Sequence, residues 1–187
     1  MREEIARVEK LLEGILLLSE FRINASNMDI RPYNLCQLLH NSSQRFKQNL
    51  STDQAARIEL ICSHDLTVEV NEQYFYFAFE HLLNNSIQYG DNSKITVTLD
   101  QVLLNDLKFA SVFVKDKGHG ISPSDAPHIF SPFYRGDGVG QSAIFGAGLG
   151  LTYAKEIINS FGGTLRLVES EEKGTIMEMR FLDISPS

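Results

Sequence analysis

Two glycine clusters constrain this chain more than any other feature of its sequence. The first, Asp116 to Ile121, reads Asp-Lys-Gly-His-Gly-Ile and follows the apolar run from Phe109 to Val114. The second, Gly146 to Leu151, reads Gly-Ala-Gly-Leu-Gly-Leu and opens a run with helical periodicity. Glycine lets the backbone approach a ligand closely, and a helix N-terminus offers free N–H groups to anions. Each cluster alone is also typical of an ordinary turn or loop, but together they indicate a nucleotide site.

Bulk composition excludes several classes of function. The 187 residues fit one domain, or one domain with an appendage, and the net charge of −7 argues against a nucleic-acid surface. Cys36 and Cys62 form no Cys-x-x-Cys pair, which disfavours a zinc site and favours a reducing, cytoplasmic setting. We expect no membrane segment or signal peptide, because no apolar stretch is long enough and charged residues crowd the start.

Residues 2–21 have the period of an amphipathic helix. Ile5, Val8 and Leu12 recur at steps of three and four, with acidic residues largely on the other face. A core helix would show the same pattern, but we favour a helix that packs in a bundle or dimer, because no other predicted helix adjoins it in sequence. The polar stretch 22–30 then marks a domain boundary.

The remaining patterns predict an α+β fold, with helices on one face of a mixed sheet. The helix over 72–90 is the clearest, since Phe75, Phe79 and Leu82 follow one face and Gly90 ends it. The full prediction comprises an extended piece at 29–31, helices over 33–49, 72–90 and 149–158, strands over 57–62, 94–99, 108–115, 164–168 and 175–181, a short strand or turn at 67–70, and a turn at 103–106.

Four sequence blocks stand in a fixed order in the second half of the chain. They are the Asn-bearing segment His81 to Gly90, the segment Asp116-x-Gly-x-Gly-Ile, the pair Phe130-x-x-Phe133, and Gly146-x-Gly-x-Gly. They resemble the N, G1, F and G2 boxes of the ATP-binding domain of sensor histidine kinases, in the superfamily that also holds gyrase, Hsp90 and MutL. The resemblance covers residues 29–183 and implies a Bergerat-type fold, a two-layer α/β sandwich preceded by one long helix.

The resemblance also implies a division of the chain and a set of ligand contacts. Residues 1–23 would be the C-terminal helix of the dimerisation and phosphoacceptor hairpin, and 29–187 the ATP-binding catalytic domain, with a mobile lid over 134–147. Asn85 matches the family's Mg²⁺-binding asparagine, whose neutral amide oxygen suits a hard cation that also holds the phosphates. Asp116 matches the carboxylate that accepts a hydrogen bond from the adenine amine.

Other residues would complete this nucleotide site. Tyr89 resembles the aromatic residue near adenine, and Arg135 is either a phosphate contact or a solvated loop arginine. The glycines of both clusters would curl under the base or close on the phosphates at the start of a helix. The implied contacts also include Gln88, Gly118, Gly120, Ile121, Tyr134, Gly146, Ala147, Gly148, Leu149, Gly150 and Leu151.

The chain departs from the family pattern at two positions of the Asn-bearing helix. Gln88 stands where many members carry a Lys or Arg that contacts phosphate, so the contact would weaken or pass to Arg135. His81 stands where Asn is common and lies one turn before Asn85 on the same face. It could act in catalysis by touching phosphate or the attacking water, and it could equally be a packed helix histidine.

The implied activity is transfer of the γ-phosphoryl group of Mg-ATP to a histidine, and then to an Asp on a response regulator receiver domain. The acceptor would lie on another segment or subunit of a homodimeric kinase, since His40 falls on a helix of the ATP-binding domain and is interpreted as structural. The other histidines, His64, His119 and His128, lie on predicted turns.

Two alternatives stay open. A gyrase- or Hsp90-type hydrolase would use a Glu one turn before the Mg²⁺-binding asparagine, but this chain has His81 there, and Glu80 is rotated off that face. A degenerate phosphotransfer or dimerisation scaffold would fit Gln88, although the intact glycine blocks oppose it.

Overall fold

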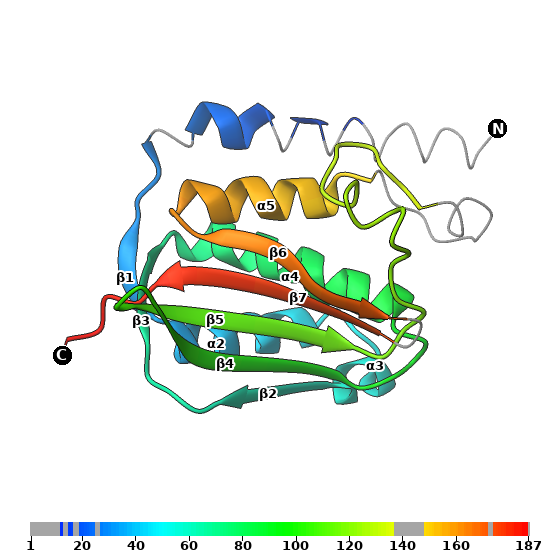
Figure 1. Cartoon of the computed structure of the whole chain (residues 1–187), viewed down its shortest axis with the longest axis horizontal. Helices are drawn as coiled ribbons and strands as arrows, with labels where there is room; N and C mark the ends of the chain where they lie inside the picture. The colour runs from blue at the N-terminus through cyan, green and yellow to red at the C-terminus, as the bar shows by residue number, and fades with distance from the viewer. Residues whose placement is uncertain are drawn as a thin grey trace.

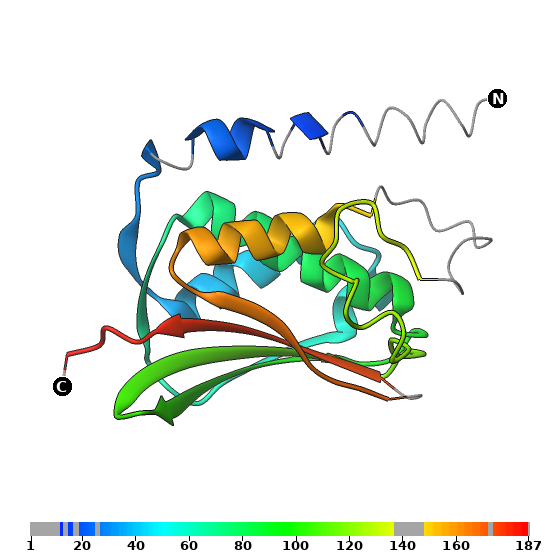
Figure 2. The same cartoon turned by 45° about the horizontal axis from the view of Figure 1, so that its top comes forward.

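The protein is a two-layer α+β sandwich in which helices cover one face of a five-stranded sheet, as Figures 1 and 2 show. The computed structural model describes residues 12, 15–16, 19–24, 27–136, 148–171 and 174–186. The elements run in the order β1 (Arg31–Asn34), α2 (Leu35–Lys47), α3 (Thr52–Ala56), β2 (Ile58–Cys62), β3 (Thr67–Val70), α4 (Glu72–Tyr89), β4 (Ile95–Leu104), β5 (Leu107–Asp116), α5 (Gly150–Ser160), β6 (Thr164–Glu171) and β7 (Gly174–Leu182). The predicted α+β class is confirmed.

The sheet has the order β2-β4-β5-β7-β6, and β1 pairs with β3 in a separate two-stranded ribbon. Four strands pair antiparallel, whereas β2 pairs with β4 in parallel. A parallel pair needs a crossover, and α4 lies in that connection, packed on the sheet. The topology therefore lays the Asn-bearing helix across the sheet whose strand β5 ends in Asp116.

Helix α4 forms the centre of the core. The Asn71 side chain caps its start by accepting from the Tyr74 amide, and Gly90 follows its last residue, as predicted. The predicted apolar face is buried, with Phe75, Phe79 and Leu83 fully inaccessible to solvent. Burial of such side chains contributes about 1.5–3 kcal/mol each, so this face holds the helix to the sheet.

The structure corrects several predicted boundaries. The helix predicted from residue 33 begins at Leu35, because Asn34 serves as its N-cap and accepts from the Gln37 amide at 2.9 Å. The strand before it is Arg31–Asn34, paired antiparallel with β3. The predicted turn over 103–106 is shorter, since Leu104 pairs with Leu107 and the turn is Asn105 and Asp106, both at positive φ.

One short helix, α3, was missed by the sequence prediction. The Ser51 side chain caps it in a capping box with Gln54, but five residues are too few to show a period.

The N-terminal segment is helical at residues 12, 15–16 and 19–24, so the helix continues past the predicted end at residue 21. The rest of the predicted helix lies outside the described residues. Figure 1 shows this segment beside α5. Phe21 is 3% exposed and meets the Tyr74 and Tyr153 rings edge-on, with centroids 5.2 and 5.7 Å away. Arg22 forms a two-point ion pair with Glu156.

Candidate functional site

Asp116 ends strand β5 with its side chain turned toward α4. It is 8% exposed, and its two oxygens are each held by one protein donor. The Ser86 hydroxyl donates to Oδ2 at 3.2 Å, and the Gly118 amide donates to Oδ1 at 3.0 Å. Each oxygen keeps a second lone pair, so this fixed carboxylate can still accept a hydrogen bond from a ligand.

The chain after Asp116 passes very close to the end of α4. A Cβ added to Gly118 would lie 1.8 Å from the Tyr89 carbonyl oxygen, so any side chain at this position requires the backbone to move. Gly120 has φ of 75°, a conformation that favours glycine. The next residue, Ile121, donates its amide to the Ser170 hydroxyl of β6. The two glycines of this cluster therefore let the chain turn tightly against the helix end.

Tyr89, the last residue of α4, is half-buried beside this turn. Its ring meets that of His119 edge-on at 5.8 Å. Burial raises the pKa of the Tyr89 hydroxyl, and the charge of Arg135 partly opposes this shift. The charge of the predicted arginine is therefore felt at the predicted aromatic residue, whereas Gln88 is exposed to solvent.

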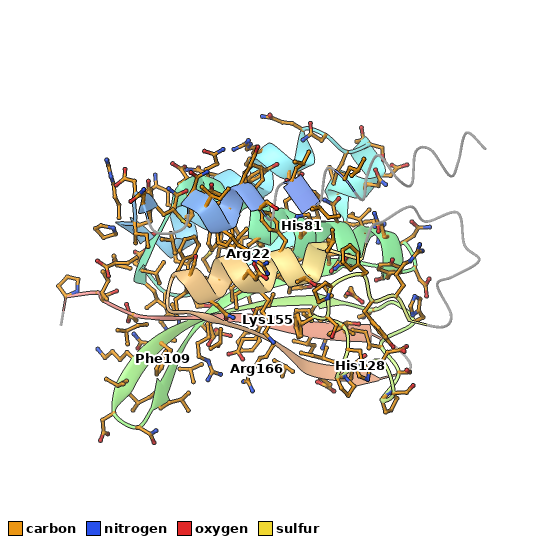
Figure 3. All side chains as sticks on the ribbon, turned by 90° about the horizontal axis from the view of Figure 1, so that it is seen from above. Arg22, His81, Phe109, His128, Lys155 and Arg166 are labelled. Carbon is orange, nitrogen blue, oxygen red and sulfur yellow. The ribbon has the colours of Figure 1, made fainter. Side chains whose placement is uncertain are left out.

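Asn85 and His81 lie one turn apart on α4 and are both half-buried. Within the described part of the chain, the Asn85 side chain makes no hydrogen bond, so its amide oxygen is available to a ligand. Burial lowers the pKa of His81 to about 4, so the imidazole is neutral near pH 7. Figure 3 shows His81 beside α5, and its ring meets that of Tyr153 edge-on at 5.6 Å.

The second glycine block meets the Phe130–Phe133 block at the start of α5. The Phe133 amide donates to the Gly148 carbonyl at 2.9 Å, and a Cβ on Gly148 would lie 2.8 Å from the Phe133 carbonyl carbon. The Thr152 hydroxyl donates to the Phe130 carbonyl at 3.0 Å. The described ends on either side of segment 137–147 are therefore joined. Gly146, Ala147 and most of the predicted lid lie outside the described residues.

Helix α5 starts at Gly150 with Leu149 as its N-cap, and within the described part of the chain no side chain caps its first amides. Leu149 is 5% exposed, and Leu151 packs partly buried against the core. The Tyr134 hydroxyl, just before the undescribed segment, donates to Asp125 at 2.6 Å. An uncapped helix start attracts an anion because its amides point outward and the helix dipole is positive there.

Sequence reasoning missed the residues that hold the site together. Ser86, which fixes Asp116, lies on the apolar stripe of α4 with Phe79 and Leu82, and a polar residue on such a stripe signals a buried partner. Ser170 and Thr152 gave no comparable signal, because each bonds to backbone that approaches only in the folded chain.

Among the described residues, no group of three or more His, Cys, Asp or Glu side chains is placed to hold a metal ion. A magnesium ion would therefore depend on the Asn85 amide and on the phosphates of a ligand, a donor set that Mg²⁺ accepts. In the same ranges, no helix combines the length and apolarity that a membrane crossing requires.

Sequence comparison with known proteins finds relatives that align with nearly the whole chain. Sensor histidine kinase YvrG of Bacillus subtilis (strain 168) is 27% identical over 183 residues, covering 97% of this chain and 30% of the relative. The signal transduction histidine-protein kinase ArlS of Staphylococcus haemolyticus (strain JCSC1435) is 31% identical over 170 residues, covering 90% of this chain and 36% of the relative. The chain thus spans a minor part of these curated relatives.

Solved structures show the same fold. The catalytic domain of histidine kinase ThkA, in a nucleotide-free form, aligns with a TM-score of 0.66 at 22% identity, covering 85% of this chain and 100% of that one. Full-length ShkA in complex with AMPPNP aligns with a TM-score of 0.73 at 18% identity, covering 100% of this chain and 38% of that one. These likenesses confirm the predicted Bergerat-type sandwich.

The family comparison covers most of the site. Residues 70–185 match the family described as histidine kinase-, DNA gyrase B- and HSP90-like ATPases. This range includes all four blocks, from the Asn-bearing helix to the start of α5. The chain therefore belongs to the histidine kinase-, DNA gyrase B- and HSP90-like ATPase family, as its sequence blocks predicted.

Proposed function

We propose that this chain is the ATP-binding catalytic part of a two-component sensor histidine kinase, acting in the cytoplasm. It would transfer the γ-phosphoryl group of ATP to a histidine outside this chain segment. The observation that carries the proposal is the fixed carboxylate of Asp116, which two donors hold at the tight turn of Gly118. Relatives named as histidine kinases over nearly the whole chain support the reaction class.

The adenine end of the site would be formed by Asp116 and the turn after it. The Ser86 and Gly118 donors hold the carboxylate in place, and the free lone pair would accept the exocyclic amine of adenine. Gly120 and Ile121 would continue the wall under the base, and Tyr89 would flank it. A hydrogen bond to a charged, preorganised acceptor contributes about 1.5–3 kcal/mol, enough to select adenine over a base without the amine.

The phosphate end would be formed where α4 faces the start of α5. The uncapped amides at Gly150 and Leu151 would receive phosphate oxygens, and Arg135 would be a further phosphate contact. Asn85 would hold Mg²⁺, which neutralises phosphate charge and orients the γ-phosphoryl group. The other predicted contacts at this end are Gln88, Tyr134, Gly146, Ala147, Gly148 and Leu149.

The phosphoacceptor would come from another segment or subunit. Residues 1–23 would be the second helix of a dimerisation hairpin in a homodimer, and the domain from 29 to 187 would deliver ATP, with its lid over 134–147. The acceptor histidine would then supply a response regulator receiver domain. His40, His64, His119 and His128 are all exposed on α2 or on loops, outside the α4–α5 contact.

A hydrolase of the gyrase or Hsp90 type has less support. Its water-activating Glu would need to face the nucleotide from the helix that carries Asn85. Burial raises the pKa of the Glu80 carboxyl, and the charge of Arg45 on α2 partly opposes this shift, so Glu80 interacts with α2. A degenerate scaffold would lack nucleotide binding altogether, so binding separates it from both enzymes.

The decisive experiment is calorimetric titration of the chain with Mg-ATP and ADP, alongside Asp116→Asn and Asp106→Asn. Asp106 directly precedes the ten-residue strand β5 and Asp116 is its last residue, so the control makes the same change about 30 Å away. We expect binding in the parent and in Asp106→Asn, and its loss in Asp116→Asn. Phosphoryl transfer to an added hairpin that bears the acceptor histidine would follow. No binding at millimolar nucleotide would refute the proposal.

A further inference from the structure

His81 is in direct contact with the first turn of α5. A Cβ built on Gly150 would lie 3.1 Å from His81 Nδ1, tighter than an ordinary contact. One turn later, the ring of Tyr153 meets the imidazole edge-on at 5.6 Å. Gly150 and Tyr153 lie three residues apart and so share one face of α5. The imidazole therefore contacts α5 at two positions that lie one turn apart.

Tyr153 is also held in place on the side that faces away from His81. Tyr153 is 5% exposed, and its ring meets Phe21 edge-on at 5.7 Å on the N-terminal helix. Edge-to-face pairs of this kind contribute about 0.5–1.5 kcal/mol beyond the area that they bury. Tyr153 therefore cannot turn away from His81 without losing a second aromatic neighbour. On its other side, His81 belongs to α4, the central helix of the core.

The chemical state of His81 suits packing better than contact with phosphate. Burial keeps the imidazole uncharged near pH 7, so it brings no positive charge to an anionic ligand. Within the described ranges, His81 meets α5 at the backbone of Gly150, which has no side chain, and at the Tyr153 ring, which is uncharged near pH 7 because burial raises the pKa of its hydroxyl to about 12.

We propose that His81 is a positioning residue that sets the spacing between α4 and the start of α5, so that Asn85 and the uncapped α5 amides address the same triphosphate. This inference rests on the proposed function and specifies how its phosphate end is built. It also explains why residue 150 must be glycine, because a methyl group there would push the helix start away from the imidazole. The histidine and the glycine are a matched pair.

The test separates phosphate binding from base binding. NMR titrations would measure the affinities of the full chain and its variants for Mg-ATP and for adenosine. A displacement of the helix start by a few tenths of an ångström should lower ATP affinity about tenfold in Gly150→Ala, because binding geometry of this kind is sensitive to sub-ångström shifts. His81→Ala should lose about threefold, since the support is gone but nothing clashes. Adenosine affinity should stay within about twofold in both variants.

The double variant His81→Ala/Gly150→Ala tests whether the two residues act as a matched pair. Removing the imidazole makes room for the new methyl group, so the double variant should bind ATP as His81→Ala does and better than Gly150→Ala. His40→Ala, an exposed histidine on α2, is the matched control and should bind as the parent does. Thermal unfolding of each variant checks that it is folded. If Gly150→Ala does not fold, the ATP and adenosine affinities of His81→Ala alone test the proposal.

Each outcome has a distinct meaning. Independent losses that multiply in the double variant would refute the matched pair, and so would an equal loss of adenosine and ATP affinity in His81→Ala. A parent chain that binds neither ligand would instead refute the proposed function.

Discussion

Lowering the pH should destabilise the fold through one residue, His81. Its pKa is lowered by burial from 6.5 to about 4 in the folded chain, so the unfolded chain takes up a proton that the folded chain excludes. A group with a depressed folded pKa contributes stability that is fully present above pH 6.5 and is lost as the pH falls toward 4. The free energy of unfolding must therefore decrease with acidification in this window.

The magnitude follows from the two pKa values. A shift from 6.5 to about 4 corresponds to about 3 kcal/mol over the whole window, at about 1.4 kcal/mol per unit. Between about pH 7 and pH 5 the linkage relation gives a loss of about 2 kcal/mol, since the unfolded histidine is then almost fully protonated and the folded one is not.

Urea unfolding of the parent chain and of His81→Gln across this pH range measures the effect. Glutamine does not titrate, so the parent should lose about 2 kcal/mol more than the variant between about pH 7 and pH 5. Carboxylates that titrate in the same range cancel in the difference. His40→Gln, at an exposed position, should keep the parent's slope. Equal slopes for the parent and His81→Gln would refute the reasoning.

Three further predictions concern a tight turn, the docking of the N-terminal helix and a buried ion-pair cluster. Gly118→Ala should destabilise the fold by about 1–3 kcal/mol and remove the thermal shift produced by ATP, because its Cβ would lie 1.8 Å from the Tyr89 carbonyl oxygen; an unchanged thermal shift would contradict the tight turn. Phe21→Ala should cost about 3 kcal/mol of helix docking, visible as faster hydrogen exchange at residues 19–24, whereas Arg22→Ala, at a side chain 65% exposed, should cost under about 1 kcal/mol. Glu178→Gln should cost about 1.5–3 kcal/mol in urea unfolding, because Arg180 and the half-exposed Arg166 lose the charge of the buried carboxylate to which they bond; a change within error would show that the cluster is dispensable.

The periodic parts of the sequence predicted the fold well. Helix α4 was predicted within a residue at its C-terminus, since Phe75, Phe79 and Leu82 keep the 3.6-residue period and Gly90 stops it. The strands β4 and β5 run longer than predicted because their far ends, such as Leu103 and Leu104, are exposed and lose the alternation of buried and exposed residues. Local capping by Asn34 decided where α2 begins.

The candidate site was predictable only as a set of blocks. Asp116, Gly118 and Gly120 could be named because a strand that ends in an acidic residue and is followed by glycines is a recognisable pattern, in which the glycines let the backbone approach a ligand. The contacts between blocks could not, because they join segments far apart in the chain. The bond from Ser86 to Asp116 joins α4 to the end of β5, and the bond from the Phe133 amide to Gly148 joins the two sides of segment 137–147.

The position of β7 in the sheet has a consequence for the order in which the protein is made. This strand is the last element of the chain, yet it lies between β5 and β6, with Thr175 directly opposite Asp116. Until residues 174–182 leave the ribosome, β5 has an unpaired edge and the strand β6 has no neighbour. The hydrogen bond from the Ile121 amide to Ser170 of β6 therefore cannot form in its final place until β7 has joined the two strands. Insertion of β7 between β5 and β6 should therefore be the step that completes the adenine end of the domain.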